Sequence, residues 1–409
     1  MLGDSAWIAI VIAGLLSLFA GLCFAELNGI LPSASGTRLY FAKAYNNWVS
    51  LSVSLFYVFA LTTVAGVEGY VLAKVLREVF PLVPPFFWVA AMLSIVVALN
   101  IRGIKTAGWF QAIITYGMIA TLLVMALIGL AHNGFHLSHP LAIGSAGNLL
   151  SAVAVGVFLF AGFEWVVPLA EEVTETRLIS RGMLIAIGIL SIAYGLFTVA
   201  MTSNVARATF LGSAIPQILF ARNVLGTAGV AIMVLITLAA SFGLFNAGVL
   251  TSSRFVYATA REHALPKGFS RLSKYMTPWV SILVVATICL LSSGLIILTG
   301  HYQTFVDVGA AVESTVYALA GLAVFRLRRK MGDAKRPFTV PGGSLVTLVT
   351  FAVFSLLTLA VLSQDVIAAL FAVVGLVTCG AYVKWVVPGM KLKAQAARRM
   401  TSRRPPMVS

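Results

Sequence analysis

Eleven long apolar runs constrain the fold of this chain more than any other feature. They cover residues 6–25, 48–76, 85–101, 108–131, 147–170, 182–203, 226–252, 278–299, 304–325, 345–363 and 366–387. A helix of roughly 20 such residues crosses the hydrocarbon of a bilayer. The connections between the runs are short and rich in turn residues, so none holds a soluble domain. The sequence therefore predicts one all-α polytopic membrane bundle.

The composition supports this prediction and argues against other classes of protein. The chain has 409 residues, 60% hydrophobic and 10% charged, with a mean hydropathy of +0.99. Its net charge of +15 comes from short loops and the C-terminal tail, so we expect no nucleic-acid binding. Cys23, Cys289 and Cys379 lie inside apolar runs and are interpreted as packing residues. The first run lacks a preceding basic stretch and a cleavage site, which favours a membrane span over a signal peptide.

The distribution of basic residues predicts the orientation. Loops on one side contain Lys74, Arg77, Arg207 and Arg222, whereas the other side and the tail contain the remaining 24 of 28. Positive residues are retained in the cytoplasm. We therefore expect a cytoplasmic C-terminus and an outside N-terminus, with multiple passes through the cytoplasmic membrane. The basic tail, 389–409, suits an anionic inner leaflet.

The run at 147–170 contains signs of a broken helix. In "FLFAGFEWVVPLAEEV", residues 158–173, Glu164 places a carboxylate at membrane depth, and Gly156, Gly162 and Pro168 are expected to loosen the helix. Transporters place such breaks at the midplane, where free backbone groups meet the substrate. The alternative is a kinked helix whose glutamate is paired in the core.

Four separated motifs resemble the amino acid/polyamine/organocation (APC) permeases over nearly the whole chain. The motifs are "AELNGILPSASGTRLY", "FAGFEWVVPLAEEV", "SSRFVYATAREHALP" and "RPFTVPGG". The matching positions are Ala25, Glu26, Leu27, Pro32, Ala34, Gly36 and Tyr40; Gly162, Phe163, Glu164, Glu171 and Glu172; Ser253, Arg254, Tyr257, Ala258, Arg261, Leu265 and Pro266; and Arg336, Pro337, Phe338, Val340, Pro341 and Gly342. Their order and their places in the topology are those of the family.

The resemblance implies an inverted-repeat, LeuT-like transporter bundle with twelve helices. Aligned on "AELNGILP", the first span of this chain matches the second family helix, so we expect the natural product to begin upstream of Met1. The implied division is an incomplete first repeat at 1–145, a second repeat at 146–325, two further helices at 326–388 and the tail at 389–409.

The resemblance and the polar residues inside the spans together indicate site residues. The substrate-binding set is Phe158, Ala161, Gly162, Phe163, Glu164 and Asn246, and the coupling or gating pair is Glu164 and Glu313. Phe158 matches an aromatic lid, with a core or lipid-facing ring as the alternative. Asn246 either touches the substrate or packs between helices. Met118 stands near the position where proton-coupled relatives carry a lysine, which leaves the coupling ion open.

Other polar residues in or near the spans are interpreted conservatively. Glu68 and Asp307 are expected near the outer ends, solvated or paired with Lys74. His132, His136 and His139 are expected in an exposed outer loop that binds no metal, because no acid or cysteine adjoins them.

The sequence thus predicts a secondary transporter for an amino acid or a related amine, working by alternating access without a cofactor. Its partners would be that small molecule, the bilayer and, if transport is coupled to them, protons. The alternative is a non-transporting remnant or accessory protein. A membrane enzyme is a third class, and we expect none, because the spans contain no nucleophile with a base and no paired metal ligands.

Overall fold

The computed structural model describes residues 5–32, 36–103, 107–133, 145–171 and 176–392. Its elements are α1 (Ala6–Ile30), α2 (Thr37–Ala44), α3 (Asn47–Val79), α4 (Pro85–Arg102), α5 (Ala107–Asn133), α6 (Ala146–Phe158), η2 (Phe163–Glu171), α7 (Thr176–Asn204), α8 (Arg207–Gly212), α9 (Pro216–Arg261), η3 (Lys267–Ser270), α10 (Trp279–Thr299), α11 (Tyr302–Lys330), α12 (Gly343–Gln364), α13 (Val366–Ala381) and η4 (Tyr382–Val386). Within these residues all regular structure is helical, and eleven segments are long and apolar enough to cross a membrane. The predicted all-α polytopic fold is confirmed.

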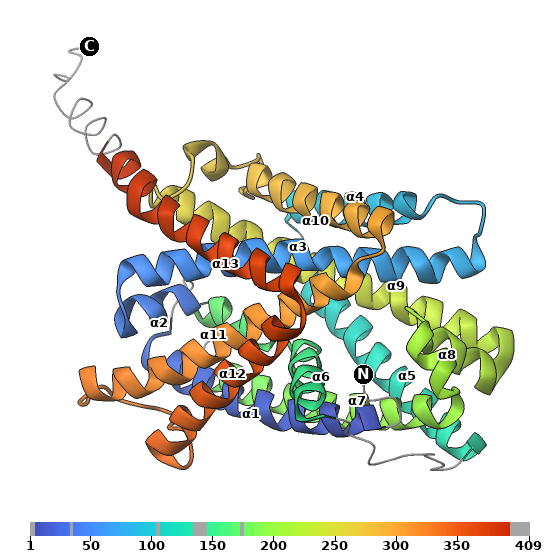
Figure 1. Ribbon diagram of the computed structural model, residues 1–409. Helices are drawn as coiled ribbons and strands as arrows, with labels where there is room; N and C mark the ends of the chain where they lie inside the picture. The colour runs from blue at the N-terminus through green and yellow to red at the C-terminus, as the bar shows by residue number, and fades with distance from the viewer. Residues whose placement is uncertain (1–4, 33–35, 104–106, 134–144, 172–175, 393–409) are drawn as a thin grey trace.

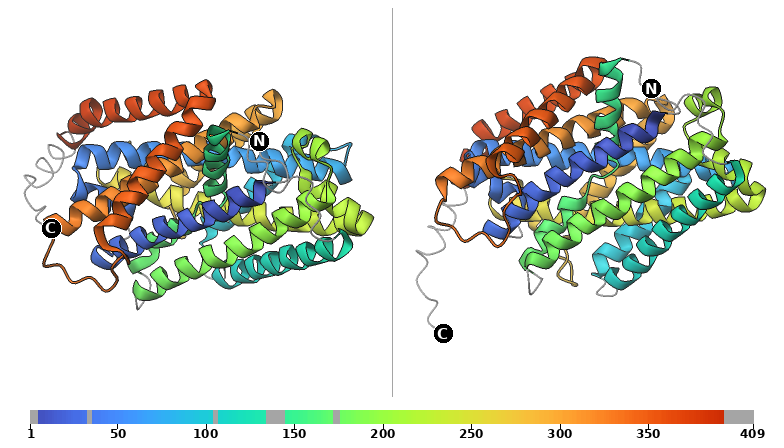
Figure 2. Two further views of the ribbon diagram at one scale, coloured as in Figure 1. Left: turned by 60° about the horizontal axis from the view of Figure 1, so that its bottom comes forward. Right: turned by 90° about the horizontal axis from the view of Figure 1, so that it is seen from below.

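The long helices form one bundle in which short α6 crosses its neighbours (Figure 1). Helix α1 packs along α7, α3 packs along α10, and α11 packs along α12. Figure 2 shows α6 standing steeply across the direction of α1 and α7. The chain therefore changes direction at the end of α6, where the sequence predicts a broken helix.

Several helices extend beyond the apolar runs of the sequence. Helix α3 begins where the side chain of Asn46 accepts a hydrogen bond from the Val49 N–H at 2.8 Å. Helix α9 spans Pro216–Arg261 rather than 226–252, with a kink at Gly226, whose φ is 59°. The short helices α2 and α8 lie in connections for which the sequence predicts only loops.

Helix α11 is buried along most of its length and forms the centre of the largest apolar cluster. Its contact with α12 depends on Gly321, because a Cβ there would lie 2.7 Å from the Thr347 carbonyl oxygen. Small residues of this kind let membrane helices approach closely. Glu313, an acidic residue of α11 with no exposed surface, is thus held in a tightly packed environment.

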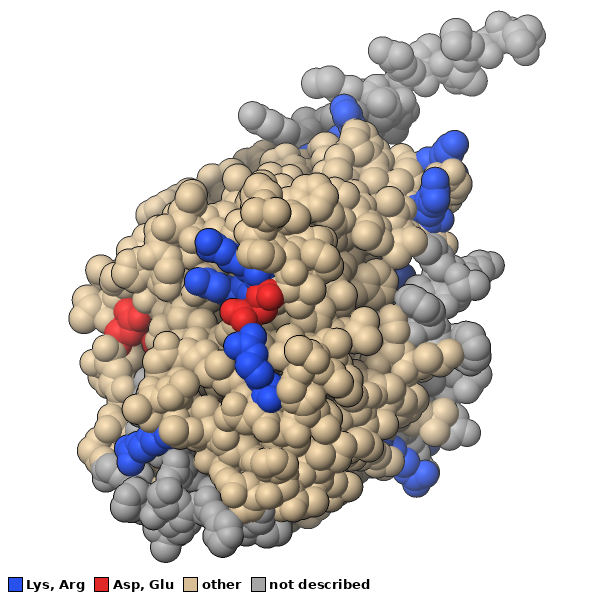
Figure 3. Space-filling view, turned by 90° about the vertical axis from the view of Figure 1, so that its right-hand side faces the viewer, with Lys and Arg blue, Asp and Glu red and all other residues tan. Residues whose placement is uncertain are grey.

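The end of the bundle that holds α8 and the start of α9 carries few charges. Arg222 of α9 forms an ion pair of 2.7 Å with Glu78 of α3, which places two of its charged side chains together. Figure 3 shows this end as a largely uncharged surface with a small group of basic and acidic side chains.

Candidate functional site

The helix break begins where the α-helical hydrogen bonds of α6 stop. The N–H groups of Leu159, Phe160 and Ala161 each bond the carbonyl three residues earlier, at 2.9–3.1 Å, which tightens the end of the helix. Gly162 follows with a φ of +104°, a conformation that side chains with a Cβ rarely adopt. A 3-10 helix then begins at Phe163. The predicted break at Gly162 is present, whereas Gly156 remains helical and lets α1 approach, since a Cβ there would lie 2.9 Å from Ala13.

Glu164 accepts a hydrogen bond from the break and from two neighbouring helices. Its side chain is 2% exposed. Oε1 accepts a hydrogen bond from the Tyr57 phenol at 2.5 Å, and Oε2 accepts from the Tyr317 phenol at 3.0 Å and from the Gly162 N–H at 3.3 Å. One carboxylate therefore connects the break to α3 and to α11, in a region where an unpaired polar group costs several kcal/mol.

A second buried carboxyl group lies beside the same phenol. Both carboxylate oxygens of Glu313, a residue with no exposed surface, are 3.4 Å from the Tyr57 oxygen. The Trp165 indole N–H donates to that oxygen at 3.3 Å. Tyr57 thus lies between the side chains of Glu164 and Glu313. The ion pairs found among the described residues involve Glu26, Glu78 and Glu262 and neither of these two carboxyl groups.

A cavity of about 570 Å³ leads to this cluster between α3, η2 and α9. At its buried end lie Tyr57, Glu164 and Trp165. At its other end lie Arg38 of α2 and Arg254 of α9, near the ion pair between Arg38 and Glu262. The volume is within the range of about 300–1,000 Å³ seen for small-molecule sites.

The other predicted site residues near the break occupy different places. Phe158 packs against α11, since a Cβ at Gly309 would meet its ring at 2.7 Å. Ala161 lies in the turn before Gly162 and is half-buried. Phe163 packs on Tyr317 with ring centroids 5.2 Å apart. Of the predicted set, Gly162 and Glu164 line the cavity.

Asn246 does not line the cavity. Its side-chain oxygen accepts a hydrogen bond of 2.8 Å from Asn100 of α4, so the structure brings it to a contact between α4 and α9. This is the arrangement expected of a packing residue.

The outer acidic residues are more buried than the sequence suggests. Glu68 accepts a hydrogen bond of 2.5 Å from Ser241 of α9, and Lys74 lies over the Tyr70 ring. Asp307 is 6% exposed and accepts a hydrogen bond from Gln303 at 3.2 Å, because the buried part of α11 begins at this residue.

The predicted histidine loop lies largely outside the described residues. His132 is exposed at the end of α5, whereas His136 and His139 fall outside that part of the chain, as do Ala34 and Glu172. Among the described residues, no group of three or more His, Cys, Asp or Glu could hold a metal ion.

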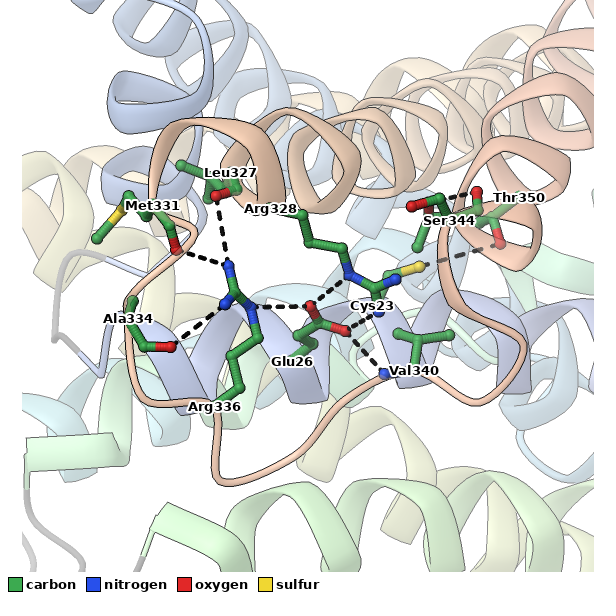
Figure 4. Close-up of polar contacts among 11 residues, drawn as sticks. Cys23, Glu26, Leu327, Arg328, Met331, Ala334, Arg336, Val340, Ser344 and Thr350 are labelled. Atoms are coloured by element: carbon green, nitrogen blue, oxygen red, sulfur yellow. Dashed lines mark hydrogen bonds and ion pairs between the residues drawn. The ribbon is translucent and has the colours of Figure 1, made fainter.

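Two of the four sequence motifs meet at a part-buried ion pair (Figure 4). Glu26 of α1, which has no exposed surface, accepts hydrogen bonds from Arg328 at 2.8 and 2.5 Å and from the Val340 N–H at 2.7 Å. Arg336 lies 3.6 Å from the same carboxylate and donates to the Met331 carbonyl at 2.8 Å. The motif at the end of α1 is thereby fixed to the connection between α11 and α12.

Sequence reasoning missed Tyr57, Trp165 and Tyr317. Tyr317 follows Glu313 by four residues, which places both on one face of a helix, so this spacing was a usable signal. The run around Tyr57 contains no such signal, because its role depends on which helices pack against α3.

These features define a multi-pass helical membrane protein with a broken helix at a buried acidic site, an arrangement found in membrane transporters. The model of the family described as "Amino acid permease" matches residues 2–388, and the chain belongs to this family of the APC superfamily. The resemblance identified from the motifs is confirmed.

The following relatives are distant in sequence. The inner membrane transport protein YbaT of Escherichia coli (strain K12) is 25% identical, over 84% of this chain and 81% of its own length. The aromatic amino acid transport protein AroP of Corynebacterium glutamicum is 25% identical, over 86% of this chain and 81% of its own length. The human cystine/glutamate transporter is 24% identical, over 81% of this chain and 68% of its own length.

Proposed function

We propose that this protein is a secondary transporter, and not an enzyme, that moves amino acids or related amines across the cytoplasmic membrane by alternating access. The observation that carries the proposal is the break at Gly162, whose carboxylate neighbour Glu164 lies at the buried end of a 570 Å³ cavity. The relatives named above, which are transport proteins, support the same class of function.

The chemistry of the buried end suits an amine. A carboxylate and two aromatic rings, those of Tyr57 and Trp165, line the cavity there. Carboxylates pair with ammonium groups, and aromatic faces attract cations. Phe158, Ala161, Phe163 and Asn246 stay predicted site residues, and the division of the chain into repeats, with 146–325 as one unit, stays a prediction.

The orientation is part of the proposal. The far end of the cavity lies beside α2 and the end of α9, on the side that the distribution of basic residues predicts to be cytoplasmic. The ion pair between Arg38 and Glu262 lies at that end, with side chains 24% and 44% exposed. Exposed pairs of this kind are weak, commonly about 0–1 kcal/mol, so this one opposes movement of α2 against α9 only slightly.

We further propose that Glu313 binds the proton of a coupled transport step. A phenol has one proton, and the 2.5 Å contact directs that of Tyr57 to Glu164. The Glu313 carboxyl group can hydrogen-bond the Tyr57 oxygen only if Glu313 is itself protonated and acts as the donor. Glu164 accepts from three donors, which suits an ionised group.

Substrate uptake tests the proposal. The purified chain is reconstituted into proteoliposomes and supplied with radiolabelled amino acids and polyamines, and empty liposomes and a Glu164→Ala variant serve as controls. We expect uptake of at least one compound, lost in the variant. Absence of uptake for every compound, together with no ligand-induced rise in melting temperature, would instead support a non-transporting accessory protein.

A further inference from the structure

A second cavity lies on the opposite side of Tyr57, between α3, α11, α12 and α13. Its volume is about 410 Å³, and its lining is almost entirely apolar, with Trp48, Phe56, Val312, Leu362 and Val373 among the residues that form it. Tyr57 lines both cavities. The size again suits a small-molecule site, but the lining offers almost nothing to a charged amino acid.

The mouth of this apolar cavity faces the membrane. Trp48, Val373 and Leu376 line it and are 48%, 58% and 39% exposed, and all three belong to membrane-spanning segments. Exposed side chains at these positions are covered by lipid rather than by water. Whatever enters between α3 and α13 therefore comes from the bilayer.

The walls of the cavity are fixed by specific contacts. The Trp48 indole N–H donates to the Gly380 carbonyl at 3.1 Å, and the Phe56 ring packs against Gly375, so α13 is held on α3 at two levels. The space between these helices is thus a built feature rather than a loose gap.

The Ser52 hydroxyl group in the wall of the cavity indicates that a ligand binds there. Ser52 is 3% exposed, lines the cavity, and makes no hydrogen bond within the part of the chain that the structure describes. A helical serine normally bonds a carbonyl one turn earlier, and a buried hydroxyl without a partner costs about 1–3 kcal/mol. An ester oxygen of a lipid would accept this hydrogen bond.

We propose that the apolar cavity binds one acyl chain of a bilayer phospholipid, which enters between α3 and α13. The chain packs against the Tyr57 ring, whose hydroxyl group joins Glu164 and Glu313. The bound lipid is thereby placed to act on the acidic cluster from the membrane side. The binding itself does not depend on which substrate the protein carries.

Photo-crosslinking tests this site. The full chain is placed in nanodiscs that contain phosphatidylcholine with a diazirine in one acyl chain, and the labelled residues are mapped by mass spectrometry. We expect labels on Val312 and Val316 of α11, which are 3% and 2% exposed and line the cavity. A lipid reaches these residues only by entering the cavity.

Two neighbouring substitutions provide the matched comparison. Val373→Trp narrows the mouth, whereas Val374, which is 59% exposed and does not line the cavity, is changed to Trp as the control. We expect the α11 labels to fall several-fold in the first variant and to stay unchanged in the second. Absence of these labels from the unsubstituted protein would overturn the proposal whether or not the variants fold, and so would equal labelling in two folded variants.

Discussion

The Tyr57 phenol oxygen lies 2.5 Å from Oε1 of Glu164, so the middle of α3 is joined to the helix break at the buried end of the cavity. Glu164 receives two further hydrogen bonds, from Tyr317 and from the Gly162 backbone. The break is therefore held by donors from three different segments, and the acceptor on which they converge is one side chain. This arrangement makes Glu164 the most informative position for substitution.

Glu164→Gln is expected to destabilise the fold and to abolish transport. The amide keeps the shape but replaces one acceptor oxygen with a donor that faces other donors, a loss of about 2 kcal/mol for a hydrogen-bonded charged group. Thermal unfolding and proteoliposome uptake measure the two effects, with Tyr317→Phe, which removes one donor, as the milder comparison. Unchanged uptake and unchanged pH dependence would leave only the kinked-helix interpretation.

Glu313→Gln is expected to leave folding nearly intact and to remove the pH dependence of uptake. An amide resembles a protonated carboxyl group and can still donate to the Tyr57 oxygen. Initial uptake rates over a range of pH, measured beside the unsubstituted protein, test this. A variant whose pH profile matches that of the parent would exclude Glu313 as the proton-binding group.

Gly162→Ala is expected to lower the melting temperature and to reduce transport. The φ of +104° costs a residue with a Cβ about 1–3 kcal/mol, although the nearest atom to that Cβ, on Trp165, is 3.7 Å away. Gly188→Ala in α7 is the matched control, since its Cβ has no neighbour within 4 Å and its backbone is helical. Equal behaviour of the two variants would show that the conformation at Gly162 is not required.

Phe158→Ala is expected to reduce transport more than stability if the ring closes the substrate cavity as in family members. The ring is half-buried against Gly309, so its removal should cost less folding free energy than the removal of a fully buried ring. Phe160→Ala is the comparison, because that ring is 2% exposed and packs on Tyr194, and its loss should cost about 3–5 kcal/mol of folding free energy. Normal transport by Phe158→Ala, with defective transport by a folded Phe160→Ala, would mean that the wrong ring has been assigned.

Glu26→Gln is expected to destabilise the protein by about 1.5–3 kcal/mol, because the half-buried Arg328 guanidinium loses its hydrogen bonds to a carboxylate. Arg336→Lys should cost much less, since Arg336 lies 3.6 Å from that carboxylate and keeps its place through backbone carbonyls. Thermal unfolding in detergent compares the two. A smaller effect for Glu26→Gln than for Arg336→Lys would contradict the central role of the Glu26–Arg328 pair.

The sequence by itself determined the membrane class, the eleven spans and the position of the break. These features depend on local composition: apolar length sets a span, and Gly162 beside an intramembrane acid marks a break. Glu313 was also singled out, because a deep carboxyl group in an apolar run is conspicuous without any knowledge of its neighbours.

Only the tertiary structure decided which side chains surround those acids. Tyr57 and Glu164 are separated by 107 positions, and Glu26 and Arg328 by 302, so no periodicity in the chain connects either pair. The hydrogen bond between Asn246 and Asn100 likewise depends on the packing of α4 on α9, which their places in two separate apolar runs do not indicate. The composition of a segment is enough to predict that it spans the membrane. The helices that it contacts depend on how the whole bundle packs, and no local sequence pattern encodes that packing.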